Sequence, residues 1–311
     1  MAKGKARKAI ITAAVTGSIH TPTMSPYLPV TPEELIQDVL SVYEAGGAVA
    51  HLHVRDPQTG LPNADQDIYR EVASEVKRRC DIVLCTTTGG KLGESVENRS
   101  RVIANLQPEL ASLNAGSLNF ALFHVAGQYE DWKHDWEKDY LEATEDYIFP
   151  NTFYTMRRFM EIMRPFETKP EFEIYDVGMI NNLAHLIRAG HVKKPVYLQF
   201  VMGILGGIPA TVDNLVYLVQ TAERLIGDFQ WSVCAAGRFQ FPMTTHALLM
   251  GGNARVGLED NLYLEKGVLA KSSGEQVAKL VRIARELGIE TATPDEARGI
   301  LGLKGLDKVK Y

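Results

Sequence analysis

The chain has 311 residues, of which 45% are hydrophobic and 23% are charged, a composition typical of a globular protein with a large core. The formal net charge of −5 argues against a nucleic-acid-binding protein. No apolar run reaches the roughly 18 residues that a membrane span needs. Three scattered cysteines do not suggest a disulfide framework. We therefore expect a cytoplasmic protein that acts on neither nucleic acids nor membranes.

Short apolar segments alternate with amphipathic segments along the whole chain. The apolar segments predict strands over 9–15, 49–56, 82–86, 110–114, 172–176, 196–201, 229–234 and 254–257. Helical spacing and capping residues predict helices over 31–45, 66–79, 95–106, 152–163, 180–188, 211–225, 243–250, 273–287 and 294–301.

Eight strand-then-helix units predict a (β/α)8 barrel, because strands that alternate with helices form a parallel sheet. No linker or change of composition divides the chain, so we expect residues 1–311 to form a single barrel domain with a C-terminal helical extension. A doubly wound open sheet is the alternative. Its dinucleotide-binding form is disfavoured because no Gly-x-Gly-x-x-Gly follows the first strand.

One segment does not fit the alternating pattern. Residues 122–150 are rich in aromatic and charged side chains, including Trp132, Trp136 and Tyr140. We interpret this segment as an insertion after the fourth strand, which forms either a lid over the barrel or a contact between subunits.

The second predicted strand carries His51 and His53. Residues i and i+2 of a strand point to the same face, so the two imidazoles lie together. Two imidazoles near the carboxyl end of a strand are suitable ligands for a divalent metal. The alternative is a pair of strand histidines that are satisfied by backbone carbonyls.

Other polar residues cluster where barrel strands end, which is where barrel enzymes place their chemistry. They are Thr86, Thr87, Thr88, Ser112, Asn114, Glu171, Glu173, Asp176, Arg255, Glu259 and Asp260. Two histidines and one carboxylate form a catalytic metal site with open positions. Glu259 or Asp260 would supply the carboxylate, since the eighth strand closes the barrel near the second. Zinc is the leading candidate, and the ferrous iron of an oxygenase would suit the same ligands.

Arg255 precedes these two acids and has two interpretations. Its planar guanidinium could bind a substrate carboxylate. Equally, it could form a structural ion pair with Glu259 or Asp260.

Several segments together resemble the β-keto acid cleavage enzymes, the family that includes 3-keto-5-aminohexanoate cleavage enzyme. They are Pro-Val-Thr-Pro-Glu-Glu at 29–34, Ala-Gly-Gly-Ala at 45–48, His-Leu-His-Val-Arg-Asp at 51–56, Thr-Thr-Gly-Gly at 87–90, Ala-Ser-Leu-Asn at 111–114 and Arg-Val-Gly-Leu-Glu-Asp-Asn at 255–261. They extend over nearly the whole chain.

The resemblance implies a zinc-containing (β/α)8 barrel that assembles as a homo-oligomer, with a tetramer favoured. It implies a reaction that joins a β-keto acid to acetyl-CoA and yields acetoacetate and a shortened acyl-CoA. Zinc would bind His51, His53 and Glu259, with Asp260 as the base and Arg255 as an electrostatic partner. Thr87 and Asn114 would contact the substrate. The residues that bind coenzyme A are not identified by the sequence.

The loop after the first strand departs from the family pattern. Members often carry a Glu in this loop, which here reads Gly17-Ser18-Ile19-His20. We expect Ser18 and His20 to contact the substrate. Without an acid to pair with an ammonium group, a cationic amino-keto acid is disfavoured. The competing functions are a metal-dependent aldolase or lyase that acts without coenzyme A, an iron oxygenase, and a barrel that binds metal only for stability.

Overall fold

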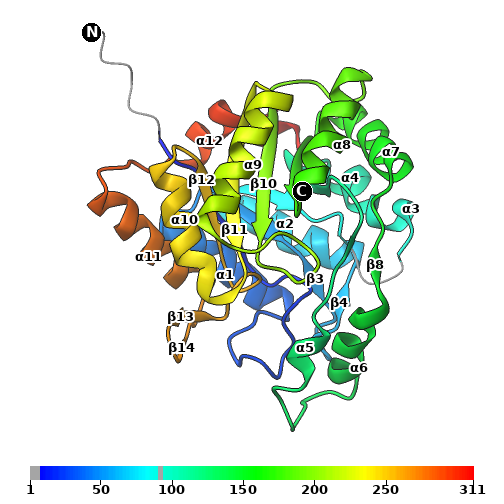
Figure 1. Cartoon of the computed structure of the whole chain (residues 1–311). Coiled ribbons are helices and arrows are strands. Elements are labelled where there is room, and N and C mark those ends of the chain that lie inside the picture. Colours follow the sequence, from blue (N-terminus) through cyan, green and yellow to red (C-terminus); the bar gives the residue numbers. More distant parts are fainter. Residues whose placement is uncertain (1–7, 90–93) are drawn as a thin grey trace.

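The computed structural model describes residues 8–89 and 94–311, so Gly90 of the Thr-Thr-Gly-Gly segment lies outside the described residues. Within the described part, eight parallel strands form a closed barrel in the order β1-β12-β11-β10-β9-β6-β5-β2 (Figure 1). Their bounds are β1 Ile11–Ala14, β2 Val49–Leu52, β5 Val83–Thr86, β6 Leu110–Asn114, β9 Lys169–Ile174, β10 Val196–Met202, β11 Phe229–Ala235 and β12 Asn253–Val256. The predicted barrel is confirmed, and the open sheet is excluded.

Helices surround the barrel and cover its two ends. They are α1 Pro32–Glu44, α2 Gln66–Arg79, α3 Val96–Arg99, α4 Arg101–Leu106, α5 Phe123–Ala126, α6 Trp136–Glu142, α7 Phe153–Met163, α8 Val177–Arg188, α9 Val212–Leu225, α10 Gln240–Leu249, α11 Ser273–Glu286 and α12 Pro294–Leu301. Short two-stranded sheets join β3 Val54–Arg55 to β4 Pro62–Asn63, β7 Leu118–Asn119 to β8 Ile148–Phe149, and β13 Tyr263–Glu265 to β14 Val268–Leu269. Among the described residues, no helix is long and apolar enough to span a membrane.

Two predicted elements are interrupted in the structure, and two helices begin three residues earlier than predicted, α8 at Val177 and α10 at Gln240. The strand predicted over 49–56 ends at Leu52, because Val54 and Arg55 pair with β4 instead of continuing the barrel. The helix predicted over 95–106 is interrupted at Ser100, whose hydroxyl donates to the carbonyl of Glu97. Side-chain bonds of this kind compete with the regular helix.

Capping residues fix where several helices begin. Thr31 and Glu34 form a capping box at the start of α1, and Thr293 and Glu296 form another at the start of α12. The side chain of Asp65 accepts hydrogen bonds from the first turn of α2. These signals lie in the sequence, which explains why the starts of these helices could be predicted closely.

The ring closes because β1 pairs with both β2 and β12. Thr12 lies opposite Val49 on one side and Arg255 on the other. The eighth barrel strand therefore lies one strand away from the second. Residues that follow β12 and residues that follow β2 meet at the same end of the barrel.

The amino-terminal end of the barrel is filled by apolar side chains and by α12. Tyr197 of β10 packs in a buried cluster with Leu301 of α12. Arg298 of α12 donates to the buried carboxylate of Glu109, with a shortest distance of 2.9 Å. This end is closed, which leaves the carboxyl end for binding.

The carboxyl end is covered by residues 118–149. Figure 1 shows α5 and α6 at the lower end of the molecule, the end toward which the arrow of β10 points. Glu137 accepts from the backbone and the hydroxyl of Thr23, and Tyr140 donates to the carbonyl of Ser18. The segment lies where a lid would lie, and its role as a subunit contact stays a prediction.

Candidate active site

Three buried side chains converge at the carboxyl end of the barrel. The Nε2 atoms of His51 and His53 are 3.1 Å apart, and Oε2 of Glu259 lies 3.7 Å and 3.6 Å from them. His51 belongs to β2, His53 lies directly after it, and Glu259 follows β12. The predicted set of two imidazoles and one carboxylate is therefore brought together, with Glu259 rather than Asp260 facing the imidazoles.

Glycines allow Glu259 to reach this position. The backbone N–H of Glu259 donates to the carbonyl of Ala14 in β1. Gly257 has a φ of +137°, and a Cβ there would lie 2.1 Å from that same carbonyl oxygen. Gly17 has a φ of +61°, and a Cβ there would lie 2.2 Å from Cγ of Glu259. Any side chain at either position would displace the carboxylate.

The donor set fits a divalent metal. Burial, together with nearby Arg255, lowers the pKa of His51 far below its ordinary value and that of His53 to about 3, so both imidazoles are neutral and keep lone pairs. Oε2 of Glu259 is buried without a hydrogen-bond partner, although it faces both rings. An unpartnered carboxylate oxygen beside two neutral imidazoles is the arrangement that a metal with three protein ligands uses.

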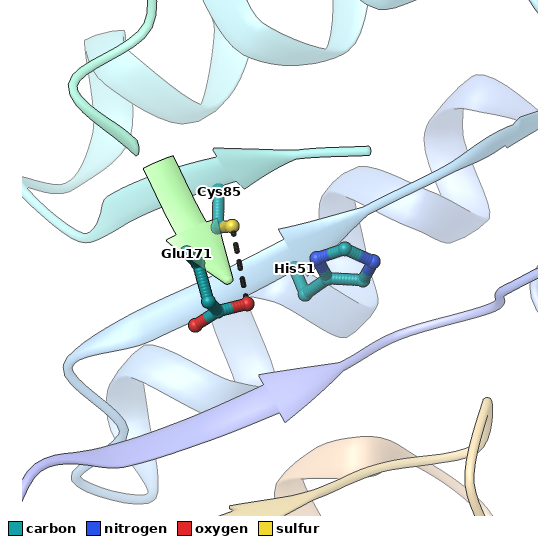
Figure 2. Close-up of side chains that lie close together, drawn as sticks. All are labelled: His51, Cys85 and Glu171. Atoms are coloured by element: carbon teal, nitrogen blue, oxygen red, sulfur yellow. Dashed lines mark hydrogen bonds between the residues drawn. The ribbon is translucent and has the colours of Figure 1, made fainter. Parts of the chain in front are cut away.

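A second group lies behind His51 (Figure 2). His51, Cys85 and Glu171 have donor atoms within 4.8 Å of one another, and the Cys85 thiol donates to Glu171 over 3.6 Å. Oε2 of Glu171 and Nδ1 of His51 are buried, and neither has a hydrogen-bond partner among the described residues. A carboxylate in this place can accept the second ring N–H of a metal-binding histidine. Sequence reasoning missed Cys85, although strand register places it opposite His51.

Arg255 sits among carboxylates. Its guanidinium donates to both oxygens of Asp260 at 2.9 Å and to Glu259 at 2.7 Å, and it lies 3.4 Å from Glu173. The structure therefore contains the ion pair that was one of the two interpretations. Burial raises the pKa of Glu173 to about 8, against the opposing effect of Arg255, and it raises the pKa of Asp260 in the same way.

A cavity of about 630 Å³ opens above the histidines, and we call it the first cavity. Three of the predicted substrate contacts line it, namely Ser18, Thr87 and Asn114. His20 does not line this cavity, because its ring turns toward the carbonyl of Leu258, 2.8 Å from Nδ1. The rest of the wall is made of residues that sequence reasoning did not assign as substrate contacts: Phe120, Leu122, Tyr140, Thr144, Tyr147, Phe149 and Tyr175. The aromatic content of residues 122–150 was the sequence signal that could have identified part of this wall.

Buried Arg55 fixes the loop that carries Ser18. Its guanidinium donates to the carbonyls of Thr16, Gly17 and His20. The arginine of the His-Leu-His-Val-Arg-Asp segment thus holds the loop after β1 in place, although the sequence suggested no role for it.

Replacing Gly17 by alanine should weaken metal binding. The new Cβ would overlap Glu259, so we expect metal affinity to fall by about ten- to a hundredfold, as when the support of a ligand is lost. Competition with a chromophoric chelator measures this. Gly190→Ala is the matched control, because Gly190 also has a positive φ, of +77°, but has open space around it. Equal affinities in the two variants would contradict the packing argument.

Two neutral imidazoles and a carboxylate at the mouth of a (β/α)8 barrel define the class: barrel enzymes whose donor set suits a divalent metal. More particularly, the chain belongs to the β-keto acid cleavage enzyme family, whose model matches residues 8–303. The predicted resemblance is thereby confirmed, and the chain is an enzyme of the acyltransferase-type β-keto acid cleavage class.

Individual relatives agree with this assignment. The chain is 44% identical to 3,5-dioxohexanoate:acetyl-CoA acetone transferase of Paraburkholderia graminis, over 98% of this chain and 99% of that protein. It is 39% identical to 3-keto-5-aminohexanoate cleavage enzyme of Acetoanaerobium sticklandii, over 95% and 98%. The solved apo structure of ObcA has a TM-score of 0.65 and 23% identity, covers 90% of this chain and 66% of ObcA, and supports the fold alone.

Proposed function

We propose that this enzyme condenses a β-keto acid with acetyl-CoA and releases acetoacetate and a shortened acyl-CoA. The observation that supports this most directly is the convergence of His51, His53 and Glu259 in the wall of the first cavity, with Asp260 directly after Glu259 in the chain. The relatives described above carry names of the same reaction type.

We assign the resident metal as zinc, held by His51, His53 and Glu259. When bound, it would act as a Lewis acid toward the oxygens of the β-keto acid. Thr87 and Asn114 line the same cavity and offer a hydroxyl and an amide that can orient the substrate carboxylate and ketone.

Asp260 is the proposed base. It removes a proton from C2, between the two carbonyl groups of the β-keto acid. C2 then bonds to the thioester carbon of acetyl-CoA, the bond between C2 and C3 of the original keto acid breaks, and the coenzyme A sulfur passes to C3. Asp260 returns the proton to C2 of acetoacetate. Arg255 lies against Asp260 and Glu259, where its positive charge would stabilise the negative charge that develops during the reaction.

The first cavity favours a substrate whose distal end is neutral. Among the described residues that line it, the ionisable acids and histidines are His51, His53, Glu173 and Glu259, all at the inner end. The rest of the wall combines aromatic rings with the hydroxyls of Ser18, Thr144 and three tyrosines. Such a wall suits an apolar, hydroxyl or keto group, and among its described residues it offers no carboxylate to pair with a primary ammonium and no Lys or Arg to pair with a second carboxylate.

A panel of β-keto acids, assayed with and without acetyl-CoA, tests this function. We expect turnover only with acetyl-CoA, and kcat/KM for neutral substrates at least about tenfold above that for amino or dicarboxylic analogues of equal length. Metal analysis of the same preparation tests for zinc, and light scattering tests the expected homo-oligomer. Cleavage that proceeds equally well without acetyl-CoA would favour the aldolase or lyase alternative.

A further inference from the structure

The buried polar pair behind His51 has no part in the reaction described above. Cys85 of β5 lies opposite His51 in the strand register, and Glu171 of β9 is the partner of Cys85. Both side chains are fully buried, and neither lines the first cavity. A carboxyl group inside a barrel has lost its contact with water, so it is stable there only when other groups satisfy its oxygens. Both oxygens of Glu171 therefore need a partner.

The structure shows one of these partners and the place of the other. The Cys85 thiol donates to Oε1 of Glu171 over 3.6 Å, which leaves Oε2 buried without a hydrogen-bond partner among the described residues. Nδ1 of His51 is buried without one in the same way. The donor atoms of the three residues lie within 4.8 Å of one another, and Figure 2 shows the imidazole ring beside the carboxyl group. This separation allows a hydrogen bond directly or through one water molecule.

The proton of the His51 ring decides which way such a hydrogen bond runs. Nε2 faces His53 and Glu259, so it is the ring nitrogen on the side of the proposed metal. A neutral imidazole carries a proton on one nitrogen and a lone pair on the other. A histidine that offers its Nε2 lone pair to a metal therefore carries its proton on Nδ1, and this N–H needs an acceptor.

We propose that Glu171 is a positioning residue that accepts the Nδ1–H of His51, with the Cys85 thiol holding the carboxyl group in place. The inference rests on the metal site of the proposed function. Glu171 has two effects: it fixes the plane of the ring, and it keeps the lone pair of Nε2 directed toward the metal. Because neither Glu171 nor Cys85 reaches the substrate cavity, both act on the reaction through His51.

Metal affinity tests the hydrogen bond. Glu171→Leu removes the acceptor and keeps a side chain of similar size, so we expect the affinity for Zn²⁺ to fall by about ten- to a hundredfold. Glu171→Gln should restore most of the affinity, because the amide oxygen still accepts the N–H. The matched control is Gln199→Leu, which removes a fully buried polar group from the neighbouring strand β10 and should leave the affinity unchanged. Competition with a chromophoric chelator measures all four proteins.

The position of the ring proton gives a readout that a purely structural role of Glu171 would not change. In the metal-free protein two acceptors compete for this proton, Glu171 beside Nδ1 and Glu259 beside Nε2. Nitrogen NMR of histidine-labelled protein, with the signal assigned by its absence in His51→Ala, distinguishes the two forms. We expect the proton on Nδ1 in the wild type and a shift toward Nε2 in Glu171→Leu.

Three results would overturn the proposal. The first is a metal-free wild-type ring that is protonated on Nε2, a measurement that remains valid if the leucine variant does not fold and that involves neither metal nor turnover, so it is separate from the proposed function. The second is an unchanged Zn²⁺ affinity in a folded Glu171→Leu variant. The third is a thiolate-to-cobalt absorption band in the cobalt-substituted enzyme that disappears in Cys85→Ser, because it would show that the three side chains bind a metal themselves.

Discussion

Replacing His51 by alanine should remove both the metal and the activity. His51 is buried, and its Nε2 faces Nε2 of His53 and Oε2 of Glu259, so its loss leaves two of the three proposed metal ligands. A Lewis acid contributes several kcal/mol to stabilising an enolate, so turnover should fall by about a thousandfold or more. Metal content, measured by atomic emission on the purified protein, should fall from about one ion per chain to almost none.

The control for this variant is His185→Ala, because His185 is an exposed histidine on α8, outside the barrel. It should keep wild-type metal content and turnover. A His51→Ala enzyme that folds, loses its metal and retains most of its activity would show that the metal is not part of the reaction. Circular dichroism establishes that both variants fold.

Replacing Asp260 by asparagine should abolish proton removal while leaving metal binding intact, and so distinguish the role of the base from that of the metal. The amide keeps the size of the side chain and cannot accept the proton from C2, so we expect turnover to fall by about a hundred- to ten-thousandfold. His51, His53 and Glu259 are unchanged, so metal content should remain near that of the wild type. Exchange of the C2 protons in D2O without acetyl-CoA, followed by NMR, measures proton removal alone and should be lost in the variant.

The pH dependence gives a second measure of Asp260. Burial raises the pKa of this carboxyl above its ordinary value, with Arg255 opposing the shift. The base acts when ionised, so kcat/KM should fall with acidity at a higher pH than an ordinary aspartate would produce. This acidic limb should be absent in Asp260→Asn. Near-normal exchange at C2 in the variant would remove Asp260 from the role of base.

The parts of the site that lie on strands could be predicted from the sequence. Strand alternation placed His51 and His53 on one face, and closure of the barrel placed Glu259 or Asp260 next to them. The family resemblance selected Glu259 of these two. The inferences from alternation and closure need only two facts: side chains alternate between the two faces of a strand, and the first and last strands of a closed barrel are neighbours. Gly257 lets the chain before Glu259 pass close to the backbone of Ala14, but this close approach became evident only in three dimensions.

The parts that depend on loop conformation could not be predicted. His20 is adjacent to Ile19 in sequence, yet its ring lies outside the first cavity because Nδ1 bonds the carbonyl of Leu258. Arg255 could have served a substrate or an ion pair, and only the positions of Asp260 and Glu259 decide between them. The first cavity arises from packing between distant loops, which no local pattern encodes.

The hydrogen bond from Tyr140 to the carbonyl of Ser18 joins the segment that covers the barrel to the loop after β1. Both residues line the first cavity, and Arg55 holds the same loop through the carbonyls of Gly17 and His20. A substitution that moves the loop therefore also moves an aromatic part of the cavity wall. New substrates should be acquired through paired changes in these two segments, while the histidines stay fixed.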